Sequence, residues 1–408
     1  MQRRVVGLAA LGYFIDILDL FLFSVLRIPS LTGLGVASAQ HLRAGVMLQN
    51  WQLGGLLIGS FVWGTLGDRR GRVRALYGSL LLYSLATLAN AAVGTLTGYA
   101  ACRFLAGLGL AGELGAAITL VSETLSTERR GLGTTLVAGC GLCGGIAAAA
   151  LAVLLPWRAC YVVGGASGLF LLALRVQLLE PALYRRAVAT AHGRGSLRLL
   201  FRRPARVLAY GRLILIGLPI WFVAGILMLL SPEFAAALGV GSAGAAAGPG
   251  AGVTAAKAVL YSYIGAALGD FACGLLSQKL RSRKRALFLS LLAVLLGILI
   301  YLHAAGISTA GFYFVCFLVG LTTGYWAVLI TTAAEHFGTN LRATVATSVP
   351  NLVRAGVIPI SLGFQWLHPR LGLVRTAVVL GVALVALALM ALAGLRETYG
   401  RDLDFQES

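Results

Sequence analysis

Long apolar stretches alternate along the chain with short polar segments rich in arginine. A transmembrane helix needs about 20 consecutive, mainly apolar residues. Twelve stretches meet this requirement, and several neighbours are so close in sequence that they must form tight antiparallel hairpins. The predicted helices cover residues 7–31, 45–66, 73–94, 97–124, 131–155, 157–179, 206–231, 254–277, 286–304, 308–334, 343–367 and 373–395. The pattern predicts an all-α membrane protein with twelve transmembrane helices.

The basic residues between these stretches predict how the chain crosses the membrane. Cytoplasmic loops carry an excess of Lys and Arg. If the N-terminus lies in the cytoplasm, the loops on that side hold the clusters at 69–74, 185–206 and 279–285, whereas the opposite side holds isolated residues such as Arg43 and Arg158. We therefore expect both termini in the cytoplasm and an even number of helices.

Composition supports a membrane protein over a soluble one. Of the 408 residues, 59% are hydrophobic and 12% are charged, whereas soluble domains carry about 25% charged residues. A net charge of +19 would suit a nucleic-acid partner, but the basic residues are clustered between apolar stretches, so we expect a lipid bilayer and no nucleic acid. The six cysteines lie in or beside apolar stretches, and we expect them, including Cys140 and Cys143, to be packing residues.

The two halves of the chain resemble each other, which predicts an internal repeat. The aligned pairs are Glu123 with Glu335, Arg130 with Arg342, and residues 64–74 with residues 274–284. We predict a six-helix bundle at 1–180, a cytoplasmic Arg-rich linker at 181–204 and a second six-helix bundle at 205–408. Parallel six-helix repeats place a substrate site between the halves, near the middle of the bilayer.

The loop between the second and third predicted helices holds the most specific motif of the chain. From Gly64 to Arg72 it reads GTLGDRRGR. This resembles G-x-L-x-D-R-x-G-R, the signature of the major facilitator superfamily in the same loop. In that family the loop is a conformational latch of the outward-open state. The resemblance implies that the latch residues are Gly64, Asp68, Arg69, Gly71, Arg72, Glu123 and Arg130, with Glu335 and Arg342 in the second half.

Further motifs resemble the bacterial metabolite and sugar proton symporters of this superfamily. Arg103 to Gly107 matches the family's R-x-x-x-G pattern on helix four, and Glu180 to Arg186 resembles the end of helix six in sugar and metabolite porters. The fifth helix lacks the Gly-Pro pair that marks many proton-coupled drug antiporters. The resemblance implies two pseudo-symmetric bundles whose helices one, four, seven and ten line a central cavity.

Ionisable residues at membrane depth are costly and are therefore candidates for function. Asp16 and Asp19 are three residues apart, so they share a helix face. A poorly solvated carboxylate can bind and release protons near neutral pH, and an arginine, which stays charged, suits an anionic substrate. The candidates for proton coupling or substrate binding are Asp16, Asp19, Glu113, Arg354, Arg103, Arg27, Asn351, Asp270, Tyr325 and Trp326. The alternative for each is a structural role, as an Asp–Arg pair between helices or an aromatic packing residue.

These observations predict a multi-pass transporter of the bacterial inner membrane, monomeric and without cofactor or metal, that uses a proton gradient. We expect it to move a small anionic or zwitterionic organic solute by alternating access. A proton-driven exporter of a metabolite, siderophore or drug is the alternative, and an uncoupled facilitator or a metal-ion carrier is a weaker one. An enzyme is not expected, because the sequence has no nucleotide-binding loop, H-E-x-x-H pair or nucleophile elbow.

Overall fold

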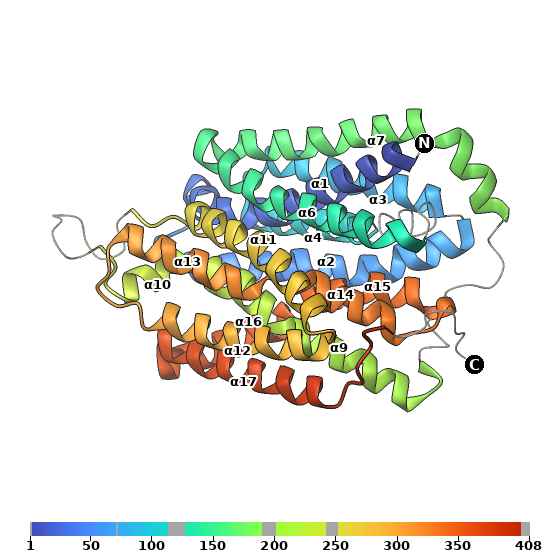
Figure 1. The fold of residues 1–408 in the computed structure, drawn as a ribbon. Coiled ribbons are helices and arrows are strands. Elements are labelled where there is room, and N and C mark those ends of the chain that lie inside the picture. The colour runs from blue at the N-terminus through green and yellow to red at the C-terminus, as the bar shows by residue number, and fades with distance from the viewer. Residues whose placement is uncertain (1, 71, 113–126, 190–200, 242–251, 401–408) are drawn as a thin grey trace. The chain divides into compact units, whose positions relative to one another are not determined.

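The protein is helical throughout the part of the chain that the structure describes. The computed structural model describes residues 2–70, 72–112, 127–189, 201–241 and 252–400 (Figure 1). Within these ranges every regular element is a helix, and no β-strand occurs. The all-α prediction is therefore confirmed for the described residues.

The contacts between residues divide the helices into two compact units. The first unit contains α1 (Gln2–Gly33), α2 (His41–Arg70), α3 (Arg72–Asn90), α4 (Leu96–Leu110), α6 (Thr127–Leu154), α7 (Trp157–Ala189) and α15 (Thr339–Ala355), with a short 3-10 helix at Ser38–Gln40. In this unit α1 packs on α6 and α7, α4 packs on α2 and α3, and α15 packs on α2. Because α15 belongs by sequence to the predicted second bundle, the division into bundles 1–180 and 205–408 stays a prediction.

The second unit contains the remaining described helices. These are α9 (Pro204–Phe222), a π-helix (Val223–Met228), α10 (Ser231–Ala237), α11 (Ala255–Lys279), α12 (Arg283–Leu302), α13 (Thr309–Thr323), α14 (Trp326–His336), α16 (Val357–Leu371) and α17 (Leu373–Ala393). In this unit α11 packs on α13, and α17 packs on α9 and α12.

Each predicted transmembrane stretch is mainly helical over its described residues, and seven of the described segments are long and apolar enough to cross a membrane. These are Val6–Gly33, Trp157–Val176, Pro204–Met228, Ala255–Lys279, Arg283–Leu302, Thr309–His336 and Leu373–Ala393. Large apolar side chains such as Leu154, Phe271 and Met390 are exposed on the helices, as expected for surfaces that face lipid. The number of twelve spans and the cytoplasmic position of the termini stay predictions.

Three of the predicted helices are interrupted, although hydropathy is continuous across them. The stretch 206–231 changes into a π-helix at Val223, and 308–334 is divided into α13 and α14 at Gly324 and Tyr325. The stretch 343–367 is divided into α15 and α16. Pro359 explains the last break, because it has no N–H to donate to the carbonyl of Ala355, where α15 ends.

Close helix packing through glycine is repeated in the two halves of the chain. In the first unit, a Cβ atom at Gly55, Gly59 or Gly107 would overlap the carbonyl oxygen of Phe104, Leu108 or Gln52. In the second unit, Gly265, Gly269 and Gly320 stand in the same relation to Phe317, Leu321 and Ser262. The α11 residues follow their α2 counterparts by 210 positions, and the α13 residues follow their α4 counterparts by 213.

This repeated packing gives the internal repeat a structural basis. The offset of 210 is the one that aligns residues 64–74 with 274–284. Glu335 follows Glu123 by 212 positions, one fewer than the offset of 213 between α4 and α13. Glu123 itself lies outside the described residues. Backbone-to-backbone contact of this kind holds membrane helices together where the lipid supplies no hydrophobic driving force.

Candidate functional site

The two acids of α1 are completely buried and have different partners. Asp16 Oδ2 lies 3.2 Å from Nη2 of Arg354, which comes from α15. Asp19 Oδ1 accepts a hydrogen bond of 2.6 Å from the hydroxyl of Thr87 on α3. The shared helix face therefore leads to two neighbouring polar sites and not to one pair of acids.

Arg103 on α4 lies in an aromatic environment beside Asp19. Its guanidinium carbon is 5.5 Å from the ring centroid of Phe23 on α1 and 5.8 Å from that of Tyr161 on α7. Its charge interacts electrostatically with Asp19, and both side chains are fully buried. None of its three nitrogens has a hydrogen-bond partner among the residues that the structure describes. A buried guanidinium in this condition has N–H donors available to an anion, because they have lost their hydration and have no hydrogen-bond acceptor among the described residues.

A hydrogen-bonded chain of hydroxyl groups holds the aromatic residues around Arg103. The hydroxyl oxygens of Tyr99 and Tyr161 are 2.5 Å apart, and the Tyr99 hydroxyl also donates to Ser30 Oγ at 3.2 Å. The rings of Tyr99 and Tyr161 meet edge to face, and Tyr99 contacts Phe23 in the same way. Trp157 packs against both tyrosines. The side chains beside Arg103 are therefore mainly aromatic and are fixed in orientation.

The remaining first-unit candidates lie around these two sites. Arg27 is buried, packs against Gly45 of α2 and donates to the carbonyl of His41 at 3.4 Å. Asn351, also buried, donates to the carbonyl of Ala111 at 3.4 Å. Glu113, the other acid predicted in this region, lies outside the described residues.

The second-unit candidates surround the break between α13 and α14. Asp270 of α11 accepts a hydrogen bond of 2.9 Å from the backbone N–H of Ala327. The Tyr325 hydroxyl donates to the carbonyl of Ile216 on α9 at 2.8 Å, and Trp326 meets Trp221 edge to face. These residues form a group of their own within the second unit.

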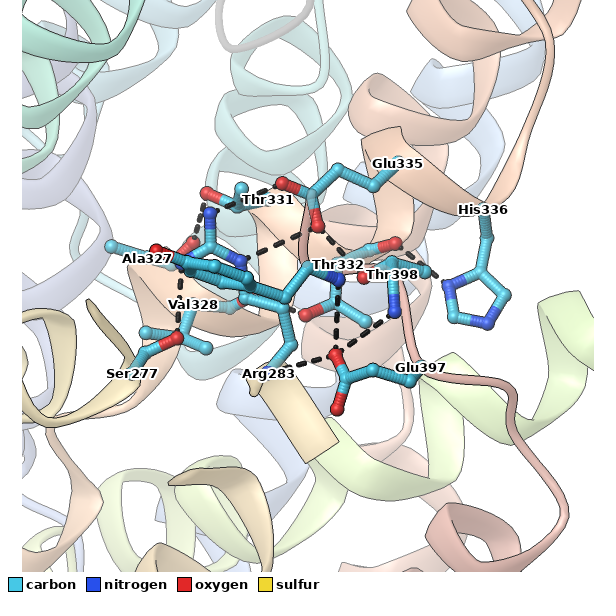
Figure 2. Close-up of polar contacts among 11 residues, drawn as sticks. Ser277, Arg283, Ala327, Val328, Thr331, Thr332, Glu335, His336, Glu397 and Thr398 are labelled. Atoms are coloured by element: carbon cyan, nitrogen blue, oxygen red, sulfur yellow. Dashed lines mark hydrogen bonds and ion pairs between the residues drawn. The ribbon is translucent and has the colours of Figure 1, made fainter. Parts of the chain in front are cut away.

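A polar cluster at the start of α12 contains Glu335, one of the residues of the predicted latch. Glu335 of α14 forms an ion pair of 3.1 Å with Arg283, and Arg283 also donates to Ser277 Oγ at 3.0 Å. Thr398, in the segment that follows α17, donates to Glu335 at 2.7 Å. Figure 2 shows the Arg283, Glu335 and Thr398 side chains turned toward one another. His336 hydrogen-bonds a carbonyl of its own helix, at 2.9 Å from Thr332.

Glu397 joins the C-terminal segment to α12 by capping that helix. Its carboxylate accepts from the backbone N–H groups of Arg283 and Lys284, at 2.9 and 3.2 Å, and from the Ser282 hydroxyl. In return, Lys284 Nζ donates to the carbonyls of Ala393 and Leu395 at the end of α17, at 2.9 and 2.8 Å. An anion at a helix N-terminus and a cation at a helix C-terminus both interact favourably with the helix dipole. The two caps fix the C-terminal segment to the α11–α12 connection.

The surroundings of Glu397 also set its protonation state. Partial burial raises the pKa of the Glu397 carboxyl, but the hydrogen bonds from Ser282 and from the backbone N–H groups of Tyr399, Arg283 and Thr398 outweigh burial and lower this pKa to about 2. Glu397 therefore stays ionised, and keeps its capping role, throughout the neutral range.

Sequence reasoning missed several of these residues, and most of the predicted latch cannot be placed. Thr87, Tyr99 and Tyr161 carry no charge, so nothing in the sequence separated them from packing residues. Glu397 and Arg283 looked like ordinary loop charges. Among the latch residues, Gly71 and Glu123 lie outside the described residues, and the side-chain positions of Gly64, Asp68, Arg69, Arg72, Arg130 and Arg342 are not described.

Comparison with known proteins identifies the relatives of this chain. The model of the family described as the Major Facilitator Superfamily matches residues 9–349. A 3-(3-hydroxy-phenyl)propionate transporter of Escherichia coli is 30% identical over 81% of this chain and 81% of its own length. A probable 4-methylmuconolactone transporter of Cupriavidus pinatubonensis is 27% identical over 98% of this chain and 91% of its own. A putative niacin/nicotinamide transporter of Bacillus subtilis is 30% identical, and the match covers 45% of this chain and 46% of that protein.

Proposed function

Because this chain belongs to the Major Facilitator Superfamily and is a membrane transporter, not an enzyme, we propose that it is a secondary active carrier of a small carboxylate with an attached ring. The proposal is carried by Arg103, a fully buried guanidinium without a hydrogen-bond partner among the described residues, held beside two aromatic rings. Its planar fork of donors matches a carboxylate, which it can bind through two parallel hydrogen bonds.

The aromatic wall suits the remainder of such a substrate. Phe23, Tyr99 and Tyr161 present ring faces and edges within the same buried region. A flat ring gains edge-to-face or offset-stacked contacts there, worth about 0.5–1.5 kcal/mol beyond its area burial. The relatives are named for niacin or nicotinamide and for a hydroxyphenylpropionate, and niacin and the propionate each combine a ring with a carboxylate.

Coupling to protons is the second part of the proposal. Asp19 lies beside Arg103, so a carboxylate substrate bound to Arg103 places a second negative charge near Asp19. Protonation of Asp19 removes that repulsion, and substrate and proton then favour each other's binding. The Thr87 hydroxyl orients the acid in this arrangement.

The Asp16–Arg354 ion pair is the proposed conformational switch of the carrier. It joins residues 338 positions apart in the chain, from α1 and α15. A proton on Asp16 cancels the attraction and so favours separation of the two helices. In the proposed alternating-access cycle this step accompanies exposure of the site to the other side of the membrane. The Arg283–Glu335–Thr398 cluster then stabilises one of the two states as the second-half latch.

Uptake into proteoliposomes tests the proposal. An internal pH dye reports proton movement while organic acids, amino acids, sugars and siderophores are added one at a time under an inward proton gradient. Protein-free vesicles correct for acids that cross the lipid unaided. We expect acidification with a ring-bearing carboxylate, lost in Asp19→Asn and in Arg103→Gln. Arg375→Gln, an arginine exposed on α17, is the matched control and should retain it.

Each other outcome has a definite meaning. Substrate-driven proton movement out of the vesicles would make the protein a proton-driven exporter and contradict symport. Carboxylate uptake without proton movement would contradict coupling and indicate a facilitator. No response to any carboxylate, from protein shown to be folded, would contradict the proposed substrate class.

A further inference from the structure

The break between α13 and α14 is built by two helices in direct backbone contact. Gly324 lies so close to α11 that a Cβ atom there would overlap the backbone of Gly269 and Asp270. Gly324 ends α13, and α14 begins two residues later at Trp326. The N-terminal N–H groups of α14 therefore start inside a membrane segment, where they cannot be left without acceptors.

Asp270 supplies the acceptor from the neighbouring helix. Tyr325 occupies the N-cap position of α14, but its side chain makes no capping hydrogen bond and instead donates to Ile216 on α9. The Asp270 carboxylate accepts from Ala327 N–H at 2.9 Å and also interacts with the backbone N–H of Trp326. Within the described residues, no lysine or arginine forms an ion pair with Asp270. Its polar contacts are those of an N-cap.

The cap fixes the two aromatic residues at the break. Trp326 is the first residue of α14 and meets Trp221 of α9, with ring centroids 6.4 Å apart. Tyr325 is fully buried and bound to α9 through its hydroxyl. The Asp270 carboxylate interacts with the backbone of α14, and a change in the direction of α14 would move both side chains.

We propose that Asp270 is a positioning residue that caps α14 from α11, and that it does not carry the coupled proton. The two roles make different demands on the side chain. An N-cap needs an oxygen acceptor, and Asn caps about as well as Asp. A proton carrier needs an ionisable group, which Asn lacks. Asp270→Asn therefore separates the roles, and Asp270→Leu removes both.

The test uses the full-length carrier with two independent readouts. Hydrogen–deuterium exchange is followed by mass spectrometry on peptides covering residues 325–336. We expect Asp270→Asn to exchange like the wild type, and Asp270→Leu to exchange about fivefold faster in this segment, which corresponds to the loss of one cap. Peptides from α12 report whether the unit as a whole stays folded.

The second readout is substrate-driven proton uptake in proteoliposomes, which rests on the proposed function. We expect Asp270→Asn to retain it while Asp19→Asn loses it. Loss of proton uptake in Asp270→Asn with substrate exchange intact would overturn the proposal, as would unchanged deuterium exchange in Asp270→Leu. If Asp270→Leu does not fold, Asp270→Asn still decides between the roles. If no carboxylate is transported by the wild type, the proposed function fails, and the exchange measurement still decides whether Asp270 is a cap.

Discussion

Removal of one partner of the Asp16–Arg354 ion pair should destabilise the protein more than removal of both. The two side chains are fully buried and their charged atoms are 3.2 Å apart. The perturbations are Asp16→Leu, Arg354→Met and the double variant, in which apolar groups of similar size replace both charges.

The expected magnitudes follow from the burial. Each single variant leaves one charge buried without its counter-ion, which costs about 3–5 kcal/mol. The double variant leaves neither charge, and an apolar replacement of a buried pair is often neutral or stabilising. The double variant should therefore be less destabilised than the sum of the single variants, by at least about 2 kcal/mol.

Reversible unfolding in mixed detergent micelles, monitored by circular dichroism, measures these free energies. Asp16→Leu combined with Arg375→Gln is the control, because Arg375 is exposed on α17, and the effects of independent sites add within about 0.5 kcal/mol. Additive effects of Asp16→Leu and Arg354→Met would refute the ion pair as a buried, energetically coupled contact.

Three further predictions follow from individual contacts. Gly320→Ala should lower the free energy of unfolding by about 1–3 kcal/mol, because its Cβ would overlap a carbonyl of α11. Gly363→Ala is the control and should not lower it, because there is open space around Gly363. Thermal unfolding compares the two variants, and equal midpoints would contradict the close packing at Gly320. Glu397 has a lower pKa in the folded protein than when unfolded, so its contribution is complete above about pH 4.5 and is lost as the pH falls toward 2; the difference in unfolding midpoint between wild type and Glu397→Gln should shrink over that range, and a constant difference would contradict the capping role. Thr87→Val removes the 2.6 Å hydrogen bond to Asp19. This change should shift the pH dependence of the transport rate and leave the free energy of unfolding nearly unchanged. An unchanged pH dependence would contradict a role of Asp19 in proton coupling.

The helices were predictable from sequence because a membrane span has a strong one-dimensional signal. A run of about 20 apolar residues is rare outside membrane-spanning helices, and each of the twelve stretches is mainly helical where described. The breaks carried a weaker signal. Pro359 follows the end of α15 and could be read from the sequence. The break at Gly324 coincides with a close contact to Gly269, which lies 55 positions earlier in the sequence. Hydropathy does not register such a contact.

The candidate site was predictable in its charges but not in its partners. The spacing of Asp16 and Asp19 gave a common helix face, yet their neighbours come from α15 and α3. Which residues face α1 depends on helix packing that no single-sequence pattern encodes. Asp270 shows the same limit, because a buried acid in a membrane segment suggests proton coupling, while its contact with Ala327 is that of a helix cap.

The most direct test of the central claim is equilibrium binding of a matched pair of ligands, niacin and nicotinamide, to the purified carrier by isothermal titration calorimetry. The two ligands differ in whether the ring carries a carboxylate or an amide. If Arg103 binds the carboxylate, the wild type should prefer niacin by about tenfold or more, since a charge-assisted hydrogen bond contributes about 1.5–3 kcal/mol. Arg103→Gln should abolish the preference and Arg375→Gln should keep it. A preference for niacin that survives in folded Arg103→Gln would contradict the claim.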